Sequence, residues 1–180
     1  MSHASGPRSN AYSVSKFTNW TAYDPFFAEA RIALKRYDST IPKSPKRPRV
    51  IVLPNPCNDF IQPCSVAEVL WKLTSLPPES IAGLRAIFIL AGTRKQEKSW
   101  HGSLMCYGCY WRNCVFLHAV PWSVAAANRD AWKNFYLHDV LVHEIGHHVD
   151  RERDNPGSDK EAFAYAYVER DWRMRQRKLA

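Results

Sequence analysis

The sequence lacks several features that mark whole classes of proteins. No apolar run is long enough to cross a bilayer, and residues 1–8 contain no apolar core of the kind that a secretory signal peptide requires. The five cysteines are odd in number, so they cannot all pair with one another in disulfides. We therefore expect no membrane partner and a cytoplasmic setting, with export that needs no N-terminal signal left open.

Strong compositional bias is also absent. Hydrophobic residues make up 46% and charged residues 23% of the 180 residues, which argues against disorder, collagen or coiled coil. The length suits one domain. Residues 1–20 are rich in serine and asparagine and have little periodicity. We predict a loosely ordered segment over residues 1–20 and a single domain over residues 21–180.

The net charge of +8 is concentrated in two clusters. One lies between prolines and consists of Lys43, Lys46, Arg47 and Arg49, and the other is the C-terminal run Arg170, Arg173, Arg175, Arg177 and Lys178. Such clusters attract nucleic acid or acidic protein partners. More often they are a solvated linker and a solvated helix end, and both interpretations stay open.

The spacing of apolar residues predicts an α+β fold. Helices are expected at residues 25–37, 65–75, 134–151 and 158–178, and strands at residues 49–53, 86–91, 104–110 and 114–119. A Pro-rich connector spans residues 41–48, and a hairpin joins the last two strands through Trp111, Arg112 and Asn113. This order predicts a mixed sheet with an edge hairpin, packed on helices.

The segment His143-Glu144-Ile145-Gly146-His147 carries the chemistry. Residues four apart lie on one face of a helix, so the imidazoles of His143 and His147 can bind one Zn²⁺ ion. Glu144 lies beside them and can take a proton from a zinc-polarised water. This apparatus hydrolyses amide bonds, so the pattern predicts a zinc metallopeptidase with one Zn²⁺ per chain, more typical of an endopeptidase than of an exopeptidase.

Glu161 is the best candidate for a third ligand. The Asn155-Pro156-Gly157 break lets the final helix fold back on the motif helix, and three small residues would permit close approach: Ala162, Ala164 and Ala166. In the alternative, Glu161 closes a capping box with Ser158. Asp150 and Asp154 are weaker rivals as ligands.

Two further residues have supporting roles in this scheme. Asp150 lies one turn beyond His147 and can accept a hydrogen bond from that imidazole, although an exposed aspartate at a helix end fits as well. Tyr165 lies four residues after Glu161, on the same helix face, where it can stabilise an oxyanion or simply pack in the core.

HEIGHHVD followed by EAFAYA resembles the gluzincin metallopeptidases, over about residues 136–168. It is most similar to small single-domain minigluzincins, IrrE/ImmA-type proteases and the catalytic domain of anthrax-lethal-factor-like enzymes. The resemblance implies a zincin-like fold, with zinc bound by His143, His147 and Glu161 and with Glu144 as the base. It also implies that an edge strand in the hairpin, within residues 108–117, pairs with the backbone of a peptide or protein substrate.

The other cysteines and histidines are expected to be structural. Cys106, Cys109 and Cys114, with Cys57 and Cys64, are predicted to be free thiols, with a second metal site or a disulfide as alternatives. His118 and His138 fit core or surface positions. His148 points about 100° away from His147 around the helix and is not assigned to the metal.

A different function class competes with the peptidase. A zinc-stabilised binding or regulatory module could keep the metal geometry without turnover and use the two basic clusters to bind nucleic acid or an acidic partner. An inactive, protease-like accessory domain is a third reading. Peptide cleavage that depends on Glu144 separates the first hypothesis from the other two.

Overall fold

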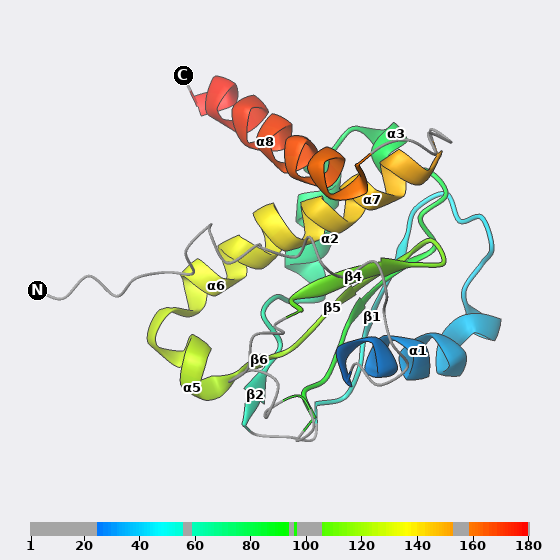
Figure 1. The fold of residues 1–180 in the computed structure, drawn as a ribbon, viewed down its shortest axis with the longest axis vertical. Helices are drawn as coiled ribbons and strands as arrows, with labels where there is room; N and C mark the ends of the chain where they lie inside the picture. The colour runs from blue at the N-terminus through cyan, green and yellow to red at the C-terminus, as the bar shows by residue number, and fades with distance from the viewer. Residues whose placement is uncertain (1–24, 56–58, 94–95, 97–105, 153–158, 180) are drawn as a thin grey trace, which may run out of the picture.

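The computed structural model describes residues 25–55, 59–93, 96, 106–152 and 159–179 (Figure 1). The predicted loose segment 1–20, Cys57, Asp154 and Ser158 lie outside these ranges. The described helical segments and strands, in chain order, are α1 (Pro25–Tyr37), η2 (Asp38–Thr40), β1 (Arg49–Val52), β2 (Phe60–Ile61), α2 (Val66–Ser75), α3 (Pro78–Ile81), β3 (Ala86–Ile89), β4 (Gly108–Trp111), β5 (Cys114–Leu117), β6 (Val120–Pro121), α5 (Trp122–Ala125), η3 (Ala126–Asn128), α6 (Arg129–Phe135), the π-helical η4 (Tyr136–Val140), α7 (Leu141–Glu152) and α8 (Lys160–Leu179).

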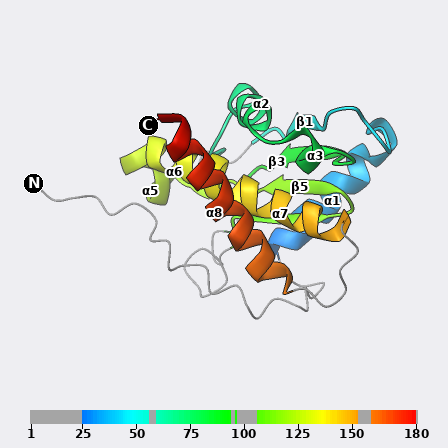
Figure 2. The ribbon, with the colours of Figure 1, turned by 90° about the horizontal axis from the view of Figure 1, so that it is seen from above.

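The central sheet has four strands in the order β1-β3-β5-β4. β1, β3 and β5 are parallel, and β4 pairs with β5 in the antiparallel direction at the edge of the sheet. α1 covers one face, and α2 and α7 cover the other, while α8 lies across α7 (Figures 1 and 2). The prediction of an α+β fold with a mixed sheet is therefore confirmed, and the hairpin lies at an edge as expected.

Alternation along the strands divides the core into two clusters. Ile87, Ile89, Val115 and Leu117 pack with apolar residues of α2 and α7, whereas Ala86, Phe88, Cys114 and Phe116 pack with those of α1. Successive side chains of a strand point to opposite faces, so both faces of a covered sheet must be apolar. All residues of β3 and β5 are accordingly buried.

The hairpin between β4 and β5 turns through Arg112 and Asn113. Both residues have positive φ angles, 50° and 58°, as a two-residue type I′ turn requires. Asn113 tolerates this conformation readily. The strands are shorter than predicted: β4 begins at Gly108 and β5 ends at Leu117, while residues 104–105 lie outside the described ranges.

The motif helix begins earlier than the predicted residue 134. Asn128 caps α6 by accepting a hydrogen bond from the amide of Ala131 at 3.0 Å. The chain then continues through the π-helical segment into α7 without leaving helical geometry. Apolar spacing alone could not place this start, because α6 has an irregular pattern and a π turn changes the register of the helix.

A buried ion pair ties α8 to α2. Nζ of Lys72 lies 2.8 Å from Oδ2 of Asp171, with both side chains inaccessible or nearly so, and Nε of Arg175 lies 3.0 Å from the same oxygen. Burial lowers the pKa of Lys72 more than Asp171 raises it. Removing Asp171 would leave the buried charge of Lys72 without compensation, whereas removing Lys72 would leave Asp171 paired with Arg175 alone.

The sequence expectation for His118 and His138 is borne out, since one is buried and the other is partly buried. Burial lowers the pKa of His118 to about 3 and that of His138 to about 4. Nδ1 of His118 lies 3.5 Å from Nε2 of Gln96, and Phe26 packs edge-on against the imidazole. Both histidines are therefore held neutral by the fold.

Among the described helices, none combines the length and hydropathy that crossing a bilayer requires.

Replacing His118 by Gln is predicted to flatten the pH dependence of stability. Below pH 6.5 the unfolded chain binds a proton on His118, whereas the folded chain does not bind it until about pH 3. The free energy of unfolding therefore falls as pH decreases across this window. The slope from this residue is about 1.4 kcal/mol per pH unit. Thermal unfolding from pH 8 to pH 4 measures it, and the value at pH 8 isolates the cost of lost packing. An unchanged slope in His118→Gln would contradict this assignment.

Candidate metal centre

α7 presents His143 and His147 on one face. Their Nε2 atoms lie 3.1 Å apart, and the imidazole planes are nearly perpendicular at 89° with ring centroids 4.7 Å apart. His143 is buried and His147 is partly exposed. The i, i+4 spacing in the sequence therefore brings the two donor nitrogens together at the surface of the helix.

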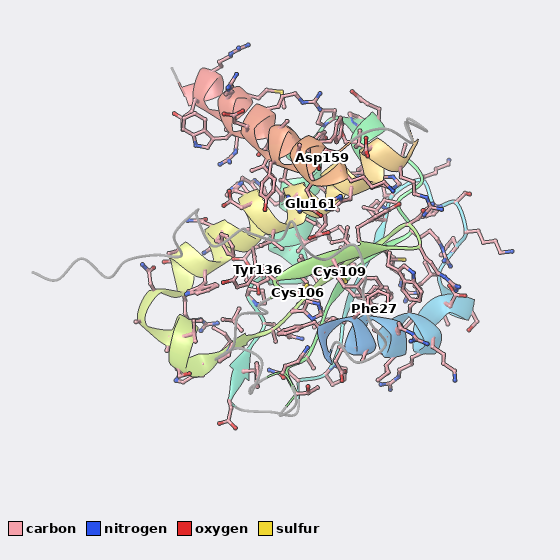
Figure 3. All side chains as sticks on the ribbon, viewed as in Figure 1. Phe27, Cys106, Cys109, Tyr136, Asp159 and Glu161 are labelled. Atoms are coloured by element: carbon pink, nitrogen blue, oxygen red, sulfur yellow. The ribbon has the colours of Figure 1, made fainter. Side chains whose placement is uncertain are left out.

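Glu161, in the first turn of α8, lies at the same place. Oε2 of Glu161 lies 3.3 Å from Nε2 of His143, and Oε1 lies 3.4 Å from Nε2 of His147. Asp159 accepts a hydrogen bond from the amide of Ala162 at 3.1 Å, so a different side chain supplies a cap for the first turn of α8. The carboxylate of Glu161 is directed at the two histidines. Figure 3 labels Glu161 and Asp159 at the start of α8.

Gly146, inside the motif, lets α8 approach α7 closely. A Cβ atom at this position would lie 2.8 Å from Cα of Ala164 and 3.2 Å from Cβ of Tyr167. Of the three alanines expected to permit close approach, Ala164 is buried in this contact, but Ala162 and Ala166 are exposed. The helices therefore meet at one small pair, Gly146 and Ala164, one turn beyond Glu161.

The arrangement fits a divalent metal ion such as zinc. Tetrahedral coordination with ligand distances of about 2.0–2.1 Å places neighbouring ligand atoms about 3.3 Å apart. The two imidazole nitrogens are 3.1 Å apart, each lies 3.3–3.4 Å from a different oxygen of Glu161, and with one ligand atom per residue the three atoms lie within 4.8 Å of one another. Oε2 of Glu161 is buried and faces Nε2 of His143 at 3.3 Å. His143, His147 and Glu161 form the one group of potential metal ligands within the described part of the chain.

Glu144 lies next to the cluster but is not part of it. Its side chain is only 7% exposed, and burial raises the pKa of its carboxyl to about 7, with Glu161 adding to the rise and His143 opposing it. The backbone amide of Tyr110 in β4 donates a hydrogen bond to this carboxylate. A buried carboxylate with a proton affinity near neutrality is the property of a general acid or base.

Gly108 lets β4 lie against the motif helix at this carboxylate. A Cβ atom there would lie 2.7 Å from Cγ1 of Val140 and 3.1 Å from Cγ of Glu144. The amide of Tyr110, two residues along the strand, is brought within reach of Glu144 by this approach. The edge strand and the motif helix are consequently held together at the site itself.

The two histidines differ in their affinity for protons. Burial lowers the pKa of His143, but the hydrogen bond and charge of Glu161 and the charge of Glu144 outweigh it, so the pKa is raised. Burial and the neighbouring His143 lower the pKa of His147 to about 4. Because a metal ion binds the neutral imidazole, it competes with the proton on His143.

The residues predicted to support the site lie close to it. The ring of Tyr165 is 4.8 Å from that of His143, and burial together with Glu161 and Glu144 raises the pKa of its phenol to about 12. Tyr165 is therefore protonated at neutral pH and can donate a hydrogen bond. Asp150 is buried, and its charge raises the proton affinity of His147.

Sequence patterns did not reveal the network around Tyr110. Its hydroxyl lies 3.0 Å from Oδ1 of Asn113 and 3.1 Å from Nδ1 of His148, and Nε2 of His148 lies 2.8 Å from the carbonyl oxygen of Ala82. His148 thus points away from the metal ligands, as predicted. The network connects α7, the hairpin and the segment after α3. It forms because β4, an otherwise apolar strand, carries the polar side chain of Tyr110 on the face toward α7.

The described cysteines, Cys64, Cys106, Cys109 and Cys114, are free. Burial raises the pKa of Cys64 to about 12 and of Cys114 to about 11, so both are inert thiols. Sγ of Cys106 donates to the carbonyl oxygen of Gly108 at 2.8 Å. The expectation of free thiols holds for these four residues, and Cys57 lies outside the described ranges.

Comparisons of the chain with protein-family models, with curated proteins and with solved structures found no match. The geometry of the side chains therefore carries the functional argument.

Gly146→Ala is predicted to weaken metal binding by about 10–100-fold, because the added methyl group forces α8, and with it Glu161, away from the histidines. Helix propensity alone would make this change stabilising by about 1 kcal/mol. Zinc titration and thermal unfolding measure both effects. Ala166→Val, at an exposed position on α8, is the control and should leave the zinc affinity unchanged. A more stable Gly146→Ala protein with full zinc affinity would refute the role of the close contact.

Proposed function

We propose that this protein is a zinc-dependent metallopeptidase. The observation that carries the proposal is the buried carboxylate of Glu144 beside a cluster of two imidazoles and one carboxylate. A metal site that only stabilises a fold has no need for a further buried acid, whose desolvation costs free energy. A hydrolytic site needs such a group to move a proton.

Each residue has a distinct task in the proposed mechanism. His143, His147 and Glu161 would hold the ion, and a bound zinc ion lowers the pKa of water to about 7 and polarises a carbonyl group. Glu144 takes the proton from the attacking water and passes it to the leaving amine. The amide of Tyr110 keeps the carboxylate of Glu144 in place during both transfers. The phenol of Tyr165 supplies a hydrogen bond to the developing oxyanion.

The edge strand offers a binding surface for a polypeptide backbone. Trp111 pairs with Cys114 and Cys109 with Phe116 next to a two-residue turn, so the backbone groups of Gly108 and Tyr110 face away from β5. The amide of Tyr110 already donates to Glu144 and the carbonyl of Gly108 accepts from Cys106, so a substrate would pair with the amide of Gly108 and the carbonyl of Tyr110. An extended substrate can align with this edge and add a strand to the sheet. Because the amide of Tyr110 donates a hydrogen bond to Glu144, a strand paired with β4 would pass directly beside the catalytic carboxylate.

We further infer a zincin-like fold of the gluzincin type, close in size to the minigluzincins. Three features support this inference: a motif helix packed on a mixed sheet, an antiparallel edge strand next to that helix, and a glutamate from the following helix at the two histidines. A peptide or protein substrate and one Zn²⁺ per chain follow from the same reasoning.

The alternative of a binding module that uses its basic surfaces gains less support. On α8, Arg173 pairs with Glu169, Arg175 pairs with Asp171, and the guanidinium of Arg170 lies 4.6 Å from the ring centroid of Tyr167. These contacts satisfy much of the C-terminal cluster within the protein. Neither a nucleic acid nor an acidic partner explains why Glu144 is buried at the metal ligands.

Glu144→Gln is predicted to reduce peptide cleavage by about 10²–10⁴-fold while zinc stays bound, because the amide keeps the shape of the carboxylate but cannot accept the proton. A peptide library digested from whole-cell protein serves as substrate, with new termini detected by mass spectrometry. Glu79→Gln, at an exposed position on α3, is the matched control. Cleavage by Glu144→Gln at the wild-type rate, or by protein stripped of metal, would refute the mechanism.

A further inference from the structure

An open groove lies between α1 and the tip of the hairpin, on the opposite side of the sheet from the metal ligands. It has a volume of about 710 Å³ and is lined by Phe27, Ala28, Arg31, Ile32, Leu34, Lys35, Asp38, Trp111 and Arg112. Phe27 and Glu161 are labelled on opposite sides of the sheet in Figure 3. The groove therefore takes no part in the chemistry described above.

The groove has a positive rim. Arg31 and Lys35 are exposed and lie four residues apart on α1, so two like charges face the same side of the helix. Within the described residues, neither is in an ion pair, and the guanidinium of Arg112 lies 4.8 Å from the ring centroid of Trp111. Asp38, the one acidic lining residue, is already paired with Arg85 at 2.8 Å. Arg31, Lys35 and Arg112 thus line the groove, and none of the three forms an ion pair with a described residue.

The floor of the groove is apolar. The rings of Phe27 and Trp111 pack edge-on with centroids 5.3 Å apart, and Ile32 is 58% exposed beside them. An exposed isoleucine next to two aromatic rings offers a contact for one aliphatic side chain. The combination of an apolar floor and a cationic rim matches a hydrophobic residue flanked by acidic residues.

The groove is continuous with the edge strand. Trp111 is the last residue of β4 and also lines the groove. Cys109 and Trp111 face the α1 cluster, whereas Tyr110 belongs to the α7 cluster. A polypeptide paired with β4 would alternate in the same way, so every second side chain would lie on the α1 side, level with Trp111.

We propose that this groove is an exosite that binds an acidic stretch of the polypeptide paired with β4, and so selects substrates with acidic residues around an aliphatic one. This inference rests on the proposed peptidase function. The continuity with a backbone-binding edge favours a polypeptide over a nucleic acid. Binding at the groove does not require cleavage, so the two proposals can fail separately.

The test measures binding of fluorescein-labelled peptides to zinc-loaded Glu144→Gln protein, which keeps the site without turnover. One short peptide carries glutamates around a leucine, and its partner has lysine in place of each glutamate. The variant Arg31→Glu/Lys35→Glu reverses the rim, and Lys43→Glu/Lys46→Glu reverses the same amount of charge at exposed positions of the Pro-rich connector. Both are made in the Glu144→Gln background. Zinc content confirms that each variant retains its metal centre.

The acidic peptide is expected to bind at least about tenfold more tightly than the lysine peptide, with affinity falling as salt rises. Charge reversal at Arg31 and Lys35 should weaken binding of the acidic peptide about tenfold. Charge reversal at Lys43 and Lys46 should weaken it less than twofold. Equal losses in both variants would overturn the proposal, since they would show only a general attraction of charge. Tighter binding of single-stranded DNA through Arg31 and Lys35 would also overturn it. Binding as expected, but no cleavage of this peptide or of any library peptide by wild-type protein, would support the groove and refute the peptidase.

Discussion

The site depends on one close contact between two helices. Gly146 of α7 and Ala164 of α8 meet at a distance that leaves no room for another carbon atom. Since Glu161 lies one turn before Ala164, this contact sets how far its carboxylate stands from the two imidazoles. Interiors at this density do not absorb an extra methyl group without moving a helix. The glycine in the motif is therefore a packing residue that positions Glu161, a candidate metal ligand on another helix.

Two further contacts keep α8 in place. The hydroxyl of Tyr167 donates to the hydroxyl of Ser80 in α3, and Asp171 pairs with the buried Lys72 of α2. A long helix fixed at three points along its length acts as a rigid support for Glu161 at its start. The buried pair has a structural role far from Glu161: loss of Asp171 would leave Lys72 buried and unpaired and would release the far end of the helix.

The sequence was informative where a regular period or a short motif determines structure. The i, i+4 spacing of His143 and His147 placed both imidazoles on one helix face, and the apolar strands predicted the mixed sheet with its edge hairpin. Alternatives for Glu161 stayed open, because its partners depend on how two helices pack, and small residues alone named Ala162 and Ala166 as well as Ala164. The Lys72–Asp171 pair and the Tyr110–His148 contact join residues far apart in the chain, which no local pattern encodes.

His143 and His147 of α7 and Glu161 of α8 are proposed to hold one metal ion together. This is tested by the zinc content of purified protein by elemental analysis, with the coordination shell determined by X-ray absorption, for wild type and Glu161→Ala. We expect about one zinc per chain with two imidazole nitrogens and carboxylate oxygen at about 2.0–2.2 Å, and a sharp loss of zinc in the variant. Wild-type protein that neither contains nor takes up zinc would contradict it. So would a Glu161→Ala protein with an unchanged coordination shell.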